Sequence, residues 1–356
     1  MRRPMRDPIA HSLPALRGGL LALLAAVLFG VSTPLVQRFG AGVGTFTTAA
    51  LLYAGAAVVG AFSRQRVERE ARVAAGDLPR LLAMAGFGAV LGPVALAWGL
   101  QHTSGTGASL MLTLEALFTV LLAWRLYRET MGLRVWTAML LLLAGGALLV
   151  LDQGRSGGGQ VLGLLAVLVA TLAWGVDNTL SRALAERDPS QVVMLKAAIG
   201  AGVTLLLAWA AGESLPDAGR AMALLLVGAS GYGLSLRLYL LAQRAFGAAR
   251  TGSVFAFAPF IGAALAVALG ERSPGALMVV GSALMLAGVV LHLGESHGHE
   301  HGHDAIEHEH AHRHDDGHHD HAHDAMPAGA HSHPHVHRAL RHAHPHVPDA
   351  HHVHRH

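Results

Sequence analysis

The sequence lacks cysteine and contains few charged residues. None of the 356 residues is a cysteine, which excludes disulfide bonds and thiolate metal sites. Charged residues make up 14% of the chain, against about a quarter in soluble domains. The sequence has no nucleotide-binding loop and no evident pairing of a nucleophile with a base. We therefore expect neither ATP-driven transport by this chain alone nor an enzymatic activity, and no nucleic-acid partner.

Long apolar runs dominate instead. Hydrophobic residues account for 52% of the chain, and the mean hydropathy is +0.42. The runs approach about 20 residues, the length that crosses about 30 Å of hydrocarbon. The fold class we predict is an all-α membrane protein of ten transmembrane helices, with spans at residues 18–37, 43–62, 80–100, 105–124, 133–151, 161–181, 191–210, 221–242, 249–269 and 275–293. Arginines before the first run resemble a signal peptide, but no small-residue cleavage site follows, so we interpret this run as a retained span.

The arginines are distributed unevenly between the two sides of these spans. With a cytoplasmic N-terminus, 16 arginines fall in inner segments and 4 in outer loops. Inner loops of membrane proteins carry the excess of basic residues. Both termini are therefore predicted to be cytoplasmic, in a multi-pass inner-membrane protein.

Two stretches of the chain are related. Residues 103–129 and 245–271 both open with small residues and close on a glutamate, about 142 residues apart. An odd number of spans in each copy makes the second copy enter the membrane from the opposite side, which is an inverted repeat typical of alternating-access transporters. The predicted organisation is a cytoplasmic segment (1–17), a first five-helix repeat (18–151), a flexible linker (152–160), a second repeat (161–293) and a cytoplasmic tail (294–356).

Several short motifs recur between the copies in a fixed order. An aromatic residue precedes glycine in spans one and six, and span nine contains Ala-Pro-Phe followed by a terminal Gly-Glu. The corresponding pairs are Phe29-Gly30 with Trp174-Gly175, Gly86 with Gly228, Gln101 with Gln243, and Ala144-Gly145 with Ala287-Gly288.

This ordered set resembles the drug/metabolite transporter superfamily, EamA type, over residues 16–293. The resemblance implies a permease of small organic molecules. The family usually carries a proline in both repeats, whereas here Ala116 replaces the first and only Pro259 remains. Since proline bends a helix, we expect a kink at Pro259 and a straighter fourth span.

Ionisable side chains inside spans are expensive and are functional candidates by default. Glu115 is the candidate for proton coupling, because no obvious partner shares its depth. The other residues predicted to line a central substrate cavity are Asp177, Asn178, Lys196, Arg237, Trp174 and Tyr239. Lys196 or Arg237 would hold a substrate carboxylate, and Trp174 and Tyr239 would pack its apolar part. In the alternative interpretation, Asp177 and Lys196 form a structural ion pair. Glu129 and Glu271, next to arginines at span ends, are assigned to the interface.

The tail is rich in histidine. Residues 297–356 hold 23 of the 26 histidines, mostly as His-x-His, with almost nothing apolar to bury, so the tail is predicted to be disordered. Neutral imidazole suits Zn, Ni, Co and Cu. The candidate metal ligands are His297, His299, His301, His303, His308, His310, His312, His314, His318, His319, His321 and His323. No cofactor is required for the membrane region, where no span carries paired metal ligands.

Three hypotheses follow. The first is a proton-coupled exporter of small organic metabolites, embedded in the lipid bilayer and able to form a homodimer. The second is an exporter of divalent transition metals in which the tail delivers or senses the ions. The third is a metal-responsive membrane sensor without transport.

Overall fold

The structure is a computed structural model of the chain. It describes residues 8–64, 71–127, 131–155, 158–181, 184, 187–246, 248–271, 275–293, 297–303, 306–312, 331–337 and 340–346.

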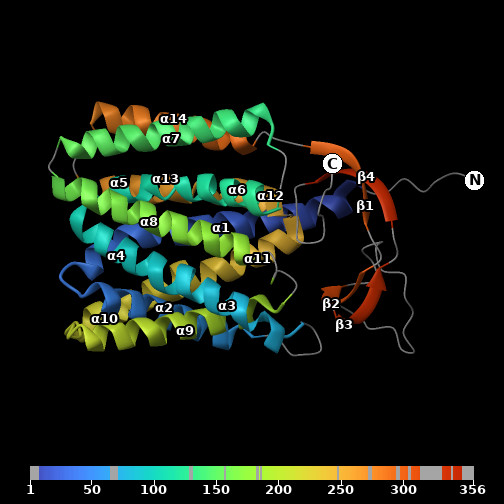
Figure 1. Cartoon of the computed structure of the whole chain (residues 1–356), viewed down its shortest axis with the longest axis horizontal. Helices are drawn as coiled ribbons and strands as arrows, with labels where there is room; N and C mark the ends of the chain where they lie inside the picture. Colours follow the sequence, from blue (N-terminus) through green and yellow to red (C-terminus); the bar gives the residue numbers. More distant parts are fainter. Residues whose placement is uncertain are drawn as a thin grey trace, which may run out of the picture.

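A bundle of long helices forms the body of the molecule (Figure 1). Its helices are α1 (Pro8–Gly40), α2 (Thr45–Phe62), α3 (Leu78–Met84), α4 (Gly92–His102), α5 (Gly105–Met111), α6 (Leu114–Tyr127), α7 (Leu133–Gly154), α8 (Gly158–Ser181), α9 (Pro189–Ala210), α10 (Ala218–Val227), α11 (Ser235–Phe246), α12 (Ala248–Phe255), α13 (Ala258–Ala268) and α14 (Ala276–Leu293). Between them lie the short 3-10 segment η2 (Ala75–Asp77) and the π segments η3 (Ala85–Leu91) and η5 (Gly228–Leu234).

Eight helical segments of the described chain are long and apolar enough to cross a membrane, and α13 and α14 are shorter apolar helices. Large apolar side chains on their outer faces are exposed, among them Leu206 and Trp209 on α9. A bilayer, where only closed hydrogen-bonded structure is tolerated, would cover such faces. The chain is therefore a multi-pass membrane protein.

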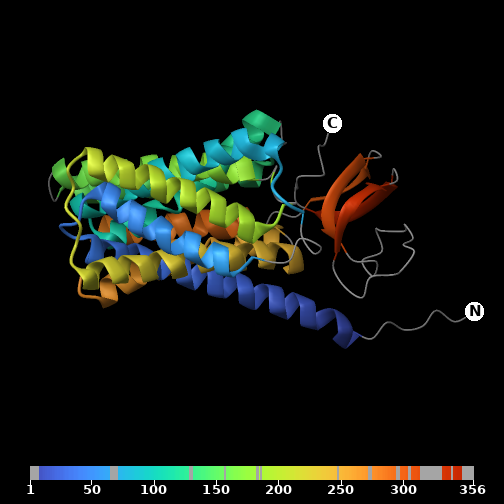
Figure 2. The same ribbon diagram turned by 90° about the horizontal axis from the view of Figure 1, so that it is seen from below.

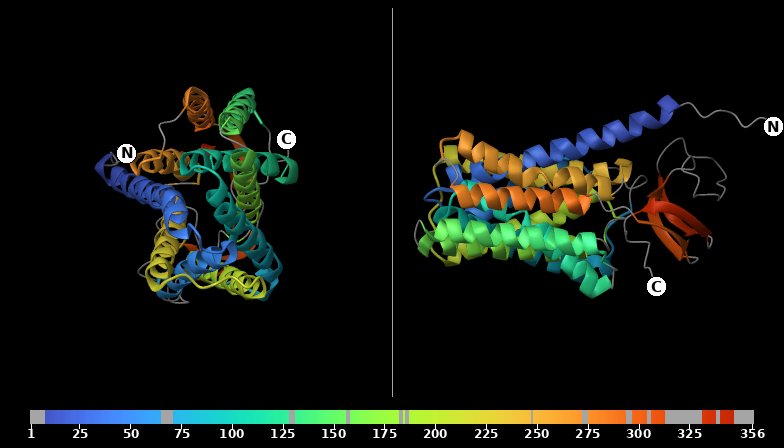
Figure 3. Two further views of the ribbon diagram at one scale, coloured as in Figure 1. Left: turned by 90° about the vertical axis from the view of Figure 1, so that its left-hand side faces the viewer. Right: turned by 90° about the horizontal axis from the view of Figure 1, so that it is seen from above.

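Helices from the two parts of the sequence pack against one another. α2 packs on α9, α4 on α8, α1 on α11 and α13, α6 on α8, and α7 on α14. The end-on view in Figure 3 shows α7 and α14 as a pair on one side of the bundle. The packing joins residues 8–154 to residues 158–293 in a single unit rather than in two separate domains.

Two spans contain a π-helical segment at matching places. The segment η3 lies between α3 and α4, and η5 lies between α10 and α11. Each contains seven residues of π-helix, AGFGAVL in η3 and GASGYGL in η5. A π turn inserts one residue and leaves backbone groups free to bond elsewhere, and such turns are frequent at functional sites. Both segments are rich in glycine, whose lack of a side chain lets another helix approach closely.

The fourth predicted span is not one continuous helix. It is interrupted between α5 and α6 at Leu112 and Thr113, as the ninth is interrupted between α12 and α13. The interruption of the fourth span therefore does not need a proline, and a straighter fourth than ninth span stays a prediction. Pro259 lies in the first turn of α13, directly after the interruption of the ninth span, where its missing N–H breaks no hydrogen bond.

Two further boundaries differ from the predicted ones. Most of the predicted linker, residues 152–160, is helical, because α7 continues to Gly154 and α8 begins at Gly158. α1 begins at Pro8, ten residues before the predicted span, and Figure 2 shows its first turns projecting beyond the bundle. Continuing a helix satisfies backbone groups that a loop would leave to solvent.

The two ends of the bundle differ. We call the end at which α1 begins the tail end, since the tail strands lie beside it, and the opposite end the distal end (Figure 1). α1, α4, α9 and α13 all finish at the distal end. Gly212 and Gly270, with φ of 68° and 99°, turn the chain there after α9 and α13.

Parts of the tail form strands, which corrects the prediction of disorder for those segments. β1 (His297–His303) pairs with β4 (Leu340–His346), and β2 (Ile306–His312) pairs with β3 (His331–His337), both antiparallel. The alternation that we expected to serve metal binding also has the two-residue period of a strand. The candidate ligands His314, His318, His319, His321 and His323 lie outside the described residues.

Candidate functional site

The polar core of the bundle is built around α8. Lys196, the only lysine of the sequence, donates from α9 to Asp177 Oδ2, and both side chains are only 8% exposed. The Oδ1 atom of Asp177 is buried without a hydrogen-bond partner among the described residues. Removing a charge from such a pair leaves an uncompensated ion in the interior. The arrangement is thus an ion pair with one carboxylate oxygen still able to accept.

Gly88 in η3 joins this ion pair to two aromatic side chains. Its carbonyl accepts hydrogen bonds from the Tyr53 hydroxyl of α2 and from Trp174 Nε1 of α8, the latter at 3.0 Å. A Cβ at Gly88 would collide with the Asp177 carboxylate and lie 2.8 Å from Lys196 Nζ. The π turn and the glycine together let helices from both parts of the sequence converge here.

Glu115 has a partner, contrary to the sequence-based expectation. It lies in the first turn of α6, and Asn178 Nδ2 donates to its Oε1 at 2.6 Å. The interruption before α6 places a carboxylate at a helix N-terminus, where the helix dipole favours negative charge. Asn178 follows Asp177 directly, so neighbouring residues of α8 bind α6 and α9.

A chain of aromatic rings borders these polar groups. Phe29 lies 6.1 Å from Trp174, 6.0 Å from Tyr232 and 5.4 Å from Phe255, measured between ring centroids. Tyr239 packs at 4.9 Å on Phe255. The structure thus connects Trp174 and Tyr239, both sequence-predicted residues, through Phe29 and Phe255.

Arg237 lies in the first turn of α11 and is half-buried. Its Nε is buried without a hydrogen-bond partner among the described residues. The hydroxyl of Tyr232, on the neighbouring segment η5, is in the same state. Buried polar groups are normally satisfied, so each of these two atoms could accept or donate a further hydrogen bond to a bound molecule or water.

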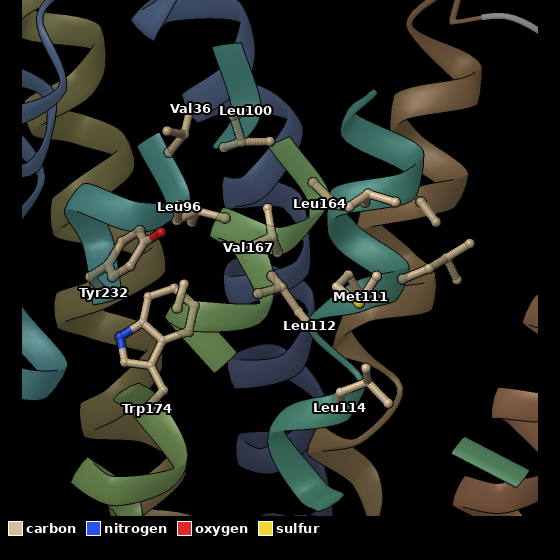
Figure 4. Packing of buried hydrophobic residues seen from close by; sticks show 14 of the residues in the cluster. Val36, Leu96, Leu100, Met111, Leu112, Leu114, Leu164, Val167, Trp174 and Tyr232 are labelled. Carbon is tan, nitrogen blue, oxygen red and sulfur yellow. The ribbon is translucent and has the colours of Figure 1, made fainter. Parts of the chain in front are cut away.

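The aromatic and polar groups are separated from the distal end by a packed apolar layer. Figure 4 shows Trp174 and Tyr232 beside the apolar side chains of this layer. The layer consists of Val36, Leu96, Leu100, Met111, Leu164 and Val167, all buried. A cleft of about 250 Å³ between α5, α13 and α14 is lined almost entirely by apolar groups and lies apart from the polar residues.

No group of three metal-ligating side chains occurs among the part of the chain whose side chains the structure describes. His102 stacks on Trp98 at 4.0 Å and its Nδ1 lies 2.7 Å from the Trp98 carbonyl oxygen. The tail histidines on the strands are described only by backbone register, and the remaining ones lie outside the described residues.

Several residues of the site were missed by reasoning from the sequence. Tyr53 and Gly88 meet through a backbone carbonyl, an acceptor that has no signature in a sequence. Tyr232 in Gly-Tyr-Gly offered a signal, an isolated aromatic hydroxyl between two glycines in a span. Glu129 lies outside the described residues. Glu271 lies at a span end, as expected, and binds the start of α5, a contact that the sequence did not indicate.

The fold and the site define a helical membrane protein. Its polar groups lie buried where residues 8–154 pack against residues 158–293. The EamA-like transporter family matches the chain twice, at residues 16–151 and 161–294. The chain belongs to the EamA-like transporter family.

The known proteins that resemble the chain include a curated transporter and a solved structure. An uncharacterised transporter of Methanothermobacter thermautotrophicus is 28% identical over 299 residues, which cover 77% of this chain and 85% of that protein. A solved crystal structure aligns with a TM-score of 0.57 at 19% identity, covering 77% of this chain and 95% of the other. The first similarity supports membrane transport, and the second concerns the fold alone.

Proposed function

We propose that this protein is a secondary active transporter that exports small organic metabolites in exchange for protons by alternating access. The observation that carries the proposal is the buried set of groups on α8, where Asp177 binds Lys196 and Asn178 binds Glu115. Charged residues in a span are expensive and are kept where substrate or protons pass. Glu115 is the residue that takes up and releases the coupled proton.

The ten spans form two inverted five-span repeats in this proposal. Two separate family matches support it, as do the π segments at equivalent places, η3 and η5. Packing supports it further: α1 on α11 corresponds to α8 on α4, and α1 on α13 to α8 on α6. Interrupted spans near a central site are a feature of such transporters. The uneven arginines place both termini in the cytoplasm, with the distal end on the outer side of the inner membrane.

The substrate class is a small organic molecule with a carboxylate and an apolar part. Lys196 is neutralised by Asp177, which leaves the half-buried Arg237 as the group that binds the carboxylate. Guanidinium binds carboxylates with two parallel hydrogen bonds. Trp174, Phe29 and Tyr239 provide an aromatic surface for the apolar part.

The test uses purified protein in proteoliposomes with an imposed pH gradient. Amino acids and related carboxylates are screened for gradient-driven flux, with Arg237→Gln as a variant. The proposal predicts flux of at least one carboxylate, with KM raised at least about tenfold by the substitution, the loss of about one charge-assisted hydrogen bond. Absence of flux for every carboxylate, together with retained folding, would contradict it.

Transport of a divalent transition metal is the second candidate, favoured by the register of the tail strands. His297, His299 and His301 lie opposite His346, His344 and His342, and His308, His310 and His312 lie opposite His335, His333 and His331. Opposed residues of an antiparallel pair share one face of the sheet. Each strand pair therefore places three pairs of histidines directly opposite each other, a set that suits Zn, Ni, Co or Cu.

Metal flux into everted vesicles under a proton gradient separates the two candidates. The full-length chain is compared with a version that stops after Glu295, using Zn, Ni, Co and Cu. Flux that depends on the gradient and falls on truncation supports a metal exporter. Metal binding by the tail without flux leaves organic transport, and no flux of any solute supports the sensor hypothesis.

A further inference from the structure

Glu271 joins two interrupted spans at the distal end. It follows Gly270, whose φ of 99° ends α13 and turns the chain toward α5. Its Oε1 accepts from the backbone N–H of Gly105 at 2.6 Å, and its Oε2 accepts from the N–H and hydroxyl of Thr106 at 2.8 and 2.6 Å. One carboxylate thus takes three hydrogen bonds from the start of a helix more than 160 residues away.

Gln37 at the end of α1 reinforces the same place. Its Nε2 donates to the carbonyl of Thr103 at 3.0 Å and lies 3.4 Å from that of Leu100. A Cβ at Gly105 would meet the side-chain oxygens of both Gln37 and Glu271. The end of α4 and the start of α5 are therefore bound by two side chains, Gln37 of α1 and Glu271, which follows α13.

Among the described residues, the two interrupted spans pack closely on each other only at this end. α5 packs along α13, whereas α6 and α12, the remaining parts of the same two spans, make at most marginal contact in the described chain. Just below the Glu271 contacts lie buried side chains of the apolar layer, including Leu100, Met111 and Leu164. A packed apolar constriction excludes water and ions.

We propose that Glu271 and Gln37 form a gate that holds the distal end closed, and that its three carboxylate hydrogen bonds must break for the site to open there. The gate rests on the alternating-access function proposed above and assigns gating roles to two residues outside the substrate site. Hydrogen bonds to a carboxylate are among the strong ones, so the closed state is favoured as long as the Glu271 side chain is bound to Gly105 and Thr106.

Glu213 offers a matched control at the same end of the bundle. Its carboxylate also takes three hydrogen bonds, from Phe46 N, Thr47 N and the Thr47 hydroxyl, at 3.2, 2.7 and 2.8 Å. It joins α9 to α2, however, and these two helices pack on each other and are also tied at the tail end by Ser190 to Ser63. Loss of this bond removes a similar interaction without separating the two interrupted spans.

The absence of cysteine makes the experiment direct, because one introduced thiol is unique. Thr113→Cys places it at the bend between α5 and α6, where Thr113 is buried and its hydroxyl has no partner among the described residues. The rate of modification by a membrane-impermeant thiol reagent is measured from each side, in right-side-out and everted vesicles. Glu271→Gln, Gln37→Leu and Glu213→Gln are then added singly.

Glu271→Gln is expected to raise the rate from the distal side at least about tenfold, about 1.4 kcal/mol, and to lower it from the tail side. Gln37→Leu is expected to act in the same direction, and Glu213→Gln to leave both rates within about twofold. Faster labelling from both sides in Glu271→Gln would indicate that this variant unfolds. The labelling rates of Gln37→Leu then test the gate in its place. Equal effects of Glu271→Gln and Glu213→Gln, or none in either, would overturn the gate. Since labelling is measured without substrate, this outcome is independent of whether a carboxylate is transported.

Discussion

Asn178 donates a hydrogen bond of 2.6 Å to Glu115, and this bond ties α8 to α6. The preceding residue, Asp177, is bound to Lys196 of α9. One turn of α8 therefore holds a carboxylate of α6 on one side and an ammonium of α9 on the other. In the proposed mechanism, protonation of Glu115 would alter the first of these contacts and so couple the proton to the packing of α6 on α8.

Glu115→Gln is expected to abolish the dependence of transport on the pH gradient while substrate exchange at equal pH continues. An amide keeps the shape of the carboxylate and can still accept from Asn178, but it cannot carry the proton. Gradient-driven flux and counterflow are compared in proteoliposomes. Asp217→Asn is the control, an exposed carboxylate that caps α10. Normal gradient-dependent flux in Glu115→Gln would refute the coupling role.

Single substitutions at the ion pair should be more harmful than the double one. Asp177→Asn or Lys196→Met leaves one buried charge unpaired, which costs about 3–5 kcal/mol. Asp177→Asn combined with Lys196→Met removes both charges and should recover much of that stability. Thermal unfolding in detergent measures the three variants. Additive losses in the double variant would show that the two side chains do not interact.

Gly88→Ala should damage the protein, whereas Gly86→Ala in the same π segment should not. A methyl group at Gly88 would collide with Asp177, and overpacking of this kind costs about 1–3 kcal/mol. A methyl group at Gly86 meets no atom within 4 Å. Stability and tryptophan fluorescence report the difference, since Trp174 bonds to the Gly88 carbonyl. Equal tolerance at both positions would contradict the close approach.

Metal binding by the tail should depend on pairing between strands. Replacing His342, His344 and His346 with Gln should weaken Zn binding as much as replacing His297, His299 and His301, because each set lies opposite the other. Replacing His351, His352 and His354, a set of equal size after β4 that is not among the candidate ligands, is the control. Binding is followed by calorimetry on the full chain.

The same binding should weaken as the pH falls. Imidazole binds a metal only when neutral, and its ordinary pKa of about 6.5 means that protonation removes ligands below that pH. Affinity should therefore be higher at pH 8 than at pH 5.5. Equal loss of Zn affinity in all three triple variants, including the control, would contradict binding by opposed histidines. Zn affinity that does not change between pH 8 and pH 5.5 would contradict binding by imidazole.

Much of the fold could be predicted from the sequence, because spanning a bilayer needs long apolar runs that are visible without an alignment. The site was predicted in part. The depth of a residue in the membrane follows from its position along the predicted span, and this is why Asp177 and Lys196 were expected to lie at a similar depth. The rotation of one helix relative to another cannot be derived from the position in the sequence, so the hydrogen bond between Asn178 and Glu115 was missed. The interruption at Thr113 was missed because it depends on contacts between helices and not on a proline.

The carbonyl of Gly88 receives donors from α2 and α8 at once. Neither helix can slide past η3 without losing a bond in the interior, so these three elements should behave as one stiff block. α2 and η3 belong to the first half of the bundle sequence, whereas α8 opens the second half. In the proposed transport cycle, the moving blocks would therefore not coincide with the two regions that match the family. The two halves of the protein, expressed as separate chains, should fold correctly only when they are made together.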